Sequence, residues 1–163
     1  AVAWISAIER RDGPTSLLFT RQNVPFMKRD GAQQAAIARG GYVLSDSPAD
    51  AKAVIIATGS EVALAIEAQK RLASQNIQVR VVSMPSTSVF DRQDAGYRAS
   101  VLPRGVPRVA VEAGVSDYWR KYVGLEGAVV GIDRFGESAP AADVFKLFGF
   151  TAENVAETVK KVL

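Results

Sequence analysis

Short apolar segments alternate along most of the chain with longer segments whose apolar residues recur at helical spacing. The apolar segments are rich in β-branched residues and end in turn signals, which is typical of strands buried in a parallel sheet. We expect strands at 42–44, 53–57, 79–84, 108–112 and 128–132, with helices at 61–74, 116–123, 140–148 and 151–163. Strands that alternate with helices predict an α/β fold: a three-layer α/β/α arrangement around a mainly parallel, roughly five-stranded sheet.

The first forty residues follow a different pattern. Residues 2–9 have helical spacing and are stopped by Asp12-Gly13-Pro14, and the apolar run 16–20 is predicted to be a strand. Residues 27–41 are polar, contain at most two helical turns and end in two glycines, so we interpret them as a linker. Asp46-Ser47-Pro48 is expected to separate the first two strands of the following domain.

A small-residue turn, Thr58-Gly59-Ser60, follows the apolar strand 53–57. Ser60 is expected to cap the next helix, and Glu61 suits the positive end of its dipole. The turn matches neither the dinucleotide-binding nor the Walker fingerprint. It is interpreted either as a tight turn or as an anion site built from the amides of residues 59–61.

Composition narrows the possible chemistry. The 163 residues contain no Cys and no His, which excludes disulfides, thiolate nucleophiles, Cys/His zinc sites and Ser-His-Asp triads built from this chain alone. No apolar run is long enough to span a membrane, and the scattered charges that sum to +3 disfavour nucleic acid, so we expect a cytoplasmic protein. The chain begins at Ala1, without Met and inside a helical pattern, which suggests a piece of something longer.

Three groups of side chains are candidates for function. Arg21, followed by Gln22 and Asn23 at the end of a predicted strand, could hold a phosphate or form a surface salt bridge. Glu112 closes a strand and could be a buried carboxylate with a shifted pKa or a cap for a neighbouring amide. The aromatic residues of segment 116–123 are interpreted as a subunit interface, with core packing as the alternative.

Several motifs together resemble one known family. They are Thr20-Arg21-Gln22-Asn23, Ala38-Arg39-Gly40-Gly41-Tyr42-Val43-Leu44, Ala57-Thr58-Gly59-Ser60-Glu61-Val62, Arg80-Val81-Val82-Ser83-Met84-Pro85-Ser86, Val111-Glu112-Ala113-Gly114 and Phe135-Gly136-Glu137-Ser138-Ala139-Pro140. In this order and spacing they look like the C-terminal end of transketolase. The resemblance implies that residues 1–26 are the tail of the middle, pyrimidine-binding domain, 27–41 a linker, and 42–163 the C-terminal α/β domain.

Transketolases transfer a two-carbon ketol unit between phosphosugars with thiamine diphosphate. The resemblance implies that this cofactor, its divalent metal (Mg or Ca) and the catalytic residues belong to segments absent from this sequence. The fragment is then expected to bind no cofactor or metal and to be inactive alone. Arg21 matches the family Arg that holds the substrate phosphate at the mouth of the channel. The family is homodimeric, and we expect 116–123 and 112–114 to face the partner.

Two alternatives stay open at this stage. The chain could be a stand-alone, non-catalytic module that binds a small anion or a protein. It could also be the C-terminal domain of another thiamine-dependent enzyme, such as a deoxyxylulose-phosphate synthase or the β subunit of an oxo-acid dehydrogenase. The motifs at 20–23 and 135–140 favour transketolase over these.

Overall fold

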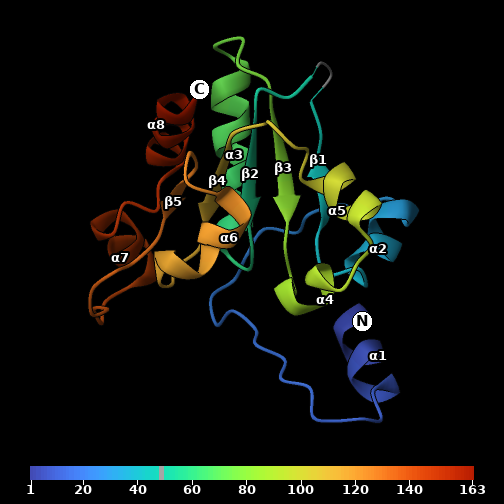
Figure 1. Cartoon of the computed structure of the whole chain (residues 1–163). Helices are drawn as coiled ribbons and strands as arrows, with labels where there is room; N and C mark the ends of the chain where they lie inside the picture. Colours follow the sequence, from blue (N-terminus) through green and yellow to red (C-terminus); the bar gives the residue numbers. More distant parts are fainter. Residues whose placement is uncertain (48–49) are drawn as a thin grey trace.

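A single mixed sheet forms the centre of the molecule (Figure 1). The computed structural model describes residues 1–47 and 50–163. The strands are β1 (Tyr42–Ser45), β2 (Ala53–Ala57), β3 (Val79–Ser83), β4 (Arg108–Val111) and β5 (Ala128–Val130), in the order β1-β3-β2-β4-β5. Only β1, at one edge, is antiparallel to its neighbour. The predicted α/β class with a mainly parallel five-stranded sheet is confirmed.

Strand β2 occupies the middle of the sheet and is buried along its whole length. It pairs in parallel with β3 on one side and β4 on the other, so that Ile55 lies opposite both Val81 and Val109. All five of its residues are fully buried. An uninterrupted apolar strand is what a parallel sheet covered on both faces requires.

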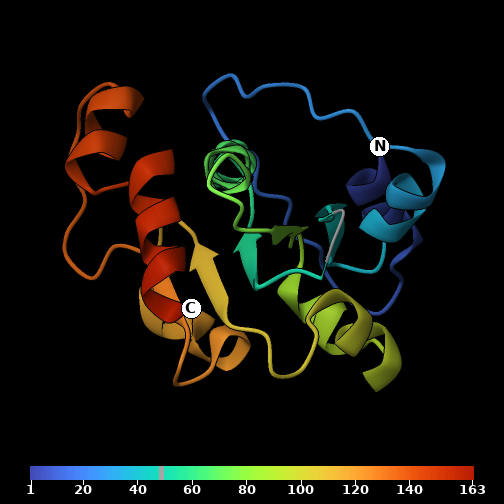
Figure 2. The same ribbon diagram turned by 90° about the horizontal axis from the view of Figure 1, so that it is seen from above.

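Helices cover the two faces of the sheet as separate layers (Figure 2). Helices α3 (Glu61–Ala73) and α8 (Ala152–Val162) pack with one set of apolar side chains, which includes Ile55 and Leu72. The other face is covered by the short elements α4 (Thr87–Asp91), α5 (Ala95–Val101), η1 (Ser116–Trp119) and α6 (Arg120–Val123). Helix α7 (Ala141–Leu147) has no buried residue. The three predicted layers are therefore present.

The N-terminal segment differs from the rest in burial. Helices α1 (Val2–Glu9) and α2 (Gly31–Ile37) contain no buried residue, and α2 lies within the predicted linker. The strand predicted at 16–20 is wrong, because these residues have no regular structure. Leu18 and Phe19 there are 89% and 68% exposed. A strand needs a neighbour for its backbone hydrogen bonds, and residues 1–47 and 50–163 provide none at that place.

Smaller differences concern the ends of elements. Strands β3, β4 and β5 end one or two residues before the predicted limits. Pro48, predicted to help separate β1 from β2, lies outside the described residues. Within the part of the chain that the structure describes, no helix combines the length and apolar character needed to cross a bilayer.

Candidate functional site

The sheet has a topological switch point between β2 and β4. The chain leaves β2 through α3 toward β3, whereas it leaves β4 through η1 and α6 toward β5, on the opposite face. The loops at the carboxyl ends of these adjacent strands therefore diverge. Ligands of open α/β sheets bind at such a point. The loops concerned are residues 58–60 and 112–114.

Glu61 is buried at this point although it is charged in its ordinary state. It is the first residue of α3 and only 4% exposed. The Ser60 hydroxyl donates to Glu61 Oε2 at 3.1 Å, and the side chain of Ser60 makes no capping bond, so its predicted capping role is wrong. Burial raises the pKa of the Glu61 carboxyl despite hydrogen bonds from Ser60 and from the backbone of Ala113.

Glu112 faces the same place from the end of β4. Its Oε2 is buried and has no hydrogen-bond partner among the described residues. Burial and the nearby charge of Glu61 raise the pKa of Glu112 to about 7. Of the two sequence interpretations, the structure favours the buried carboxylate over the cap. With no His or Cys in the chain, Glu112 is the side chain suited to exchange a proton near neutral pH.

Glu61 and Glu112 line a crevice of ≈ 640 Å³. Its walls come from the 58–60 turn, from Ser86 and from the N-terminal segment 15–20. Figure 1 shows this segment, in blue, below the carboxyl ends of the strands. Two carboxyl groups and no basic side chain of the described residues line the crevice next to Gly59 and Ser60, so the geometry favours the tight-turn interpretation of the 58–60 turn.

Arg21 is placed apart from the two glutamates. Thr20 lines the crevice, but Arg21 is exposed and is not among the residues that line it. Its neighbours in sequence, Leu18 and Phe19, are exposed as well. Arg21 therefore lies on the surface and does not line the crevice of Glu61 and Glu112.

The aromatic segment 116–123 lies mostly in the core. Trp119 and Tyr122 are 4% and 5% exposed, and their rings pack at 5.6 Å between centroids. For these two rings the structure favours the core-packing alternative, because the turn of η1 into α6 directs both toward the sheet. Tyr118 remains 52% exposed, with its hydroxyl 2.7 Å from Thr87 Oγ1, and Val115 is 63% exposed.

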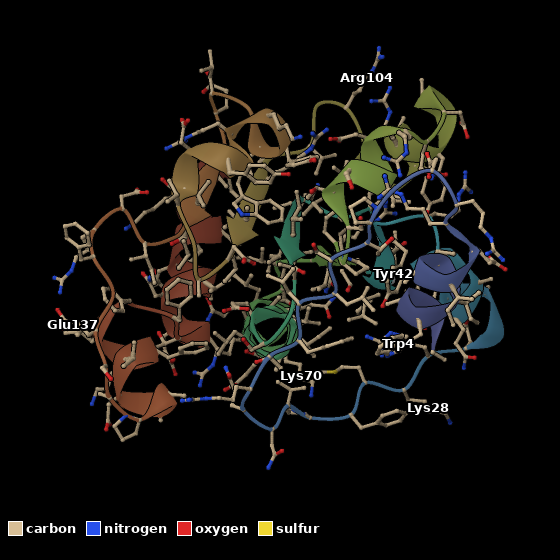
Figure 3. All side chains as sticks on the ribbon, turned by 90° about the horizontal axis from the view of Figure 1, so that it is seen from below. Trp4, Lys28, Tyr42, Lys70, Arg104 and Glu137 are labelled. Atoms are coloured by element: carbon tan, nitrogen blue, oxygen red, sulfur yellow. The ribbon has the colours of Figure 1, made fainter. Side chains whose placement is uncertain are left out.

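Metal-ligating side chains are not clustered in this structure. Within residues 1–47 and 50–163, no group of three or more His, Cys, Asp or Glu side chains could hold a metal ion. Figure 3 looks onto the carboxyl edge of the sheet and shows Glu137 at the outer rim. Glu137 accepts a hydrogen bond from Arg134 at 2.9 Å. Buried Glu61 and half-buried Glu112 are therefore the distinctive feature of this edge.

Comparison with known proteins identifies the family. The model of the transketolase-like TK C-terminal domain matches residues 40–151. Transketolase 2 of Aliivibrio fischeri is 56% identical over 164 aligned residues, which cover 100% of this chain and 25% of the relative. The chain belongs to the transketolase family. It spans about a quarter of the length of the curated transketolases it matches.

Solved structures agree with this assignment. Transketolase from Pichia stipitis in complex with sedoheptulose-7-phosphate superposes with a TM-score of 0.88 at 43% identity, covering 99% of this chain and 23% of that one. A split-gene transketolase described as an inactive β4 tetramer superposes with a TM-score of 0.63 at 29% identity, over 88% of this chain and 48% of that one. The fold is therefore that of transketolase C-terminal regions.

The buried carboxyl of Glu112 generates a pH prediction. The folded chain keeps this proton up to about pH 7, whereas an ordinary Glu loses it near 4.5. The folded state thus binds more protons in this window, so the free energy of unfolding falls as pH rises from 4.5 to 7. Glu112→Gln should reduce this slope and raise the free energy of unfolding at pH 8 by about 1–2 kcal/mol, after discounting for partial exposure.

Urea denaturation at pH 5 and pH 8 measures this difference. Glu126→Gln, which changes an exposed carboxylate, is the matched control and should leave the slope as in the wild type. If the two variants show the same pH dependence, Glu112 does not hold a proton in the folded chain.

Proposed function

We propose that this chain is the C-terminal part of a cytoplasmic enzyme that transfers a two-carbon ketol unit between sugar phosphates with thiamine diphosphate. The observation that supports this most strongly is the match of the whole chain to a quarter of a transketolase at 56% identity. A relative with the same fold was solved with a sugar phosphate, sedoheptulose-7-phosphate. These relatives favour transketolase over a deoxyxylulose-phosphate synthase, an oxo-acid dehydrogenase or a stand-alone module.

The proposal includes a division of the chain into three parts. Residues 1–26 would be the tail of the pyrimidine-binding domain, 27–41 a linker and 42–163 the C-terminal domain. Burial supports this division, because the apolar core lies entirely within the last part. The first part instead exposes Trp4, Ile5, Ile8, Leu18, Phe19, Val24 and Phe26. Such a run of exposed apolar side chains requires further protein to cover it.

The role proposed for the C-terminal domain is architectural. Thiamine diphosphate and its divalent metal, Mg or Ca, would bind to the rest of the enzyme, since the described residues contain no cluster suited to that metal. The chain alone is proposed to be inactive and to bind neither group. The split-gene relative, described as an inactive β4 tetramer, shares this fold over 88% of this chain, which supports the proposal that the chain alone is inactive.

Arg21 is proposed to bind the substrate phosphate. A guanidinium offers several donors in one plane, which match the oxygens of a phosphate group. Its exposure on the first segment leaves those donors available to a ligand. The crevice beside Thr20 is lined by Glu61 and Glu112 and, within the described part of the chain, offers no positive side chain to a phosphate, which favours Arg21 over the Gly59–Ser60 turn as the phosphate-binding group.

The proposed enzyme is a homodimer in which the 112–118 region contacts the partner subunit. Val115 and Tyr118 are the apolar side chains of this region that remain exposed. Both lie beside the carboxyl edge of the sheet, where they line a second hollow together with Glu112. Exposed aromatic and branched side chains next to a cleft are common at subunit interfaces.

Arg21→Gln tests the proposed substrate contact in the full-length enzyme. Loss of a charge-assisted contact to phosphate should raise KM for a sugar phosphate about 10- to 100-fold. Turnover of an unphosphorylated sugar should stay nearly unchanged. Steady-state kinetics on both substrates check this, with Arg11→Gln on the same segment as control and the isolated 163-residue chain as an inactive blank. An equal loss on both substrates would contradict phosphate binding by Arg21.

Tyr118→Asp tests the proposed subunit contact. A charge placed in an apolar interface should raise the dimer dissociation constant of the full-length enzyme at least about tenfold. Analytical ultracentrifugation over a dilution series measures this. Leu147→Asp, a change at an exposed apolar residue of α7, should leave the dimer intact. A Tyr118 variant that stays as dimeric as this control would exclude the 112–118 region from the interface.

A further inference from the structure

Basic side chains gather around a hollow at the amino edge of the sheet, away from the crevice of the two glutamates. The hollow has a volume of ≈ 380 Å³. Arg98 of α5, Arg104 of the following loop, Arg108 at the start of β4 and Lys121 of α6 all line it. These residues come from four separate parts of the chain, so their sequence spacing does not reveal the cluster.

Arg108 forms the inner part of this hollow. Its Nη1 donates to the backbone oxygen of Tyr122 at 2.8 Å, and its Nη2 donates to those of Leu102 and Pro103 at 3.1 and 2.8 Å. These contacts fix the guanidinium but contribute no negative charge. Its Nε is buried and has no partner among the described residues. Burial lowers the pKa of Arg108, which reflects the cost of holding this charge away from water.

Arg98, Arg104 and Lys121 form the exposed rim. Figure 3 shows the Arg104 side chain extending outward from its loop near α5. The only carboxylate that lines the hollow, among the described residues, is Asp91, and it already accepts hydrogen bonds from Lys121 at 2.8 Å and from the Tyr122 hydroxyl at 2.9 Å. Four positively charged side chains and one carboxylate thus line the hollow, which leaves a local excess of three positive charges. This excess equals the net charge of the entire chain, +3.

We propose that this hollow, defined by Arg98, Arg104, Arg108 and Lys121, binds a small phosphate-bearing anion. A dianion offsets most of the local excess of positive charge, including that of the half-buried Arg108 guanidinium. Two arginines on the rim supply planar donors that fit phosphate oxygens. The volume accommodates a phosphate or a small phosphate monoester rather than a polymer.

The site is separate from the substrate contact proposed for Arg21. Arg21 lies in the first segment, whereas all four basic residues belong to the domain 42–163. The proposal rests on the side chains around the hollow and on none of the residues assigned to catalysis or substrate. It adds an anion site to a domain for which the proposed function requires only architecture.

Isothermal titration calorimetry of the 163-residue chain tests the site with inorganic phosphate, glycerol phosphate and acetate. Phosphate and glycerol phosphate should bind, and the tighter of the two indicates whether the site takes the free ion or a monoester. Acetate should bind at least about tenfold more weakly because it carries a single charge. Affinity should fall as salt rises. Acetate binding as tight as that of phosphate would contradict the proposal.

Paired variants locate the binding. Arg98→Ala combined with Arg104→Ala should weaken phosphate binding at least about tenfold, since two charge-assisted contacts are lost at exposed positions that the fold does not need. Arg11→Ala with Lys70→Ala removes two exposed charges elsewhere and should leave the affinity within about twofold.

Arg21→Ala separates this site from the proposed substrate contact. The variant should bind phosphate at this hollow as tightly as the wild type. This result is expected whether or not Arg21 contacts the substrate in the full-length enzyme. Phosphate binding that is as tight in the Arg98/Arg104 double variant as in the wild type, or that is lost with Arg21→Ala, would overturn the proposal.

Discussion

The burial of β2 on both faces is the constraint on which the rest of the structure depends. A strand with no exposed residue needs a hydrogen-bonded neighbour on each side and a helical layer above and below. Those requirements place β3 and β4 beside it and commit α3 and α8 to one face and α5 and α6 to the other. They also fix the divergence of the loops after β2 and β4, which creates the crevice at the carboxyl edge.

Charged side chains of opposite sign gather at the two edges of the sheet. At the carboxyl edge Glu61 lies close enough to Glu112 for its charge to raise the pKa of Glu112. At the amino edge the half-buried guanidinium of Arg108 is held by backbone oxygens and faces further cations. A glutamate at the carboxyl edge becomes neutral by keeping a proton. A guanidinium at the amino edge does not become neutral, because it does not lose a proton near neutral pH. An anion is the remaining means of compensation at the basic edge.

Much of the domain could be predicted from sequence because its signals are local. The apolar runs of β2 and β3 and the amphipathic pattern of α8 each indicate their element without tertiary information. The strand predicted at 16–20 fails because a strand depends on a neighbour, which no local pattern reports. The core position of Trp119 and Tyr122 cannot be decided from the sequence for a similar reason: an aromatic pair on a short helix looks alike in a core and in an interface.

The candidate sites also differ in how far local sequence signals reveal them. Glu112 could be singled out by its place at the end of a strand, but the rise of its pKa depends in part on Glu61, the first residue of α3, which the sequence indicates only as a partner of the helix dipole. The basic cluster was missed entirely, since its residues approach one another only after four elements pack. Arg21 is a separate case: it was assigned from the family resemblance, and its role stays a prediction.

Amide hydrogen exchange on the 163-residue chain most directly tests the central claim, that 42–163 is a self-contained scaffold and 1–26 belongs to a domain completed by other protein. The account predicts strong protection in β2, β3, β4, α3 and α8, with the amides of 1–26 exchanging almost as fast as in an unfolded peptide. Protection of 1–26 equal to that of β2 would contradict it.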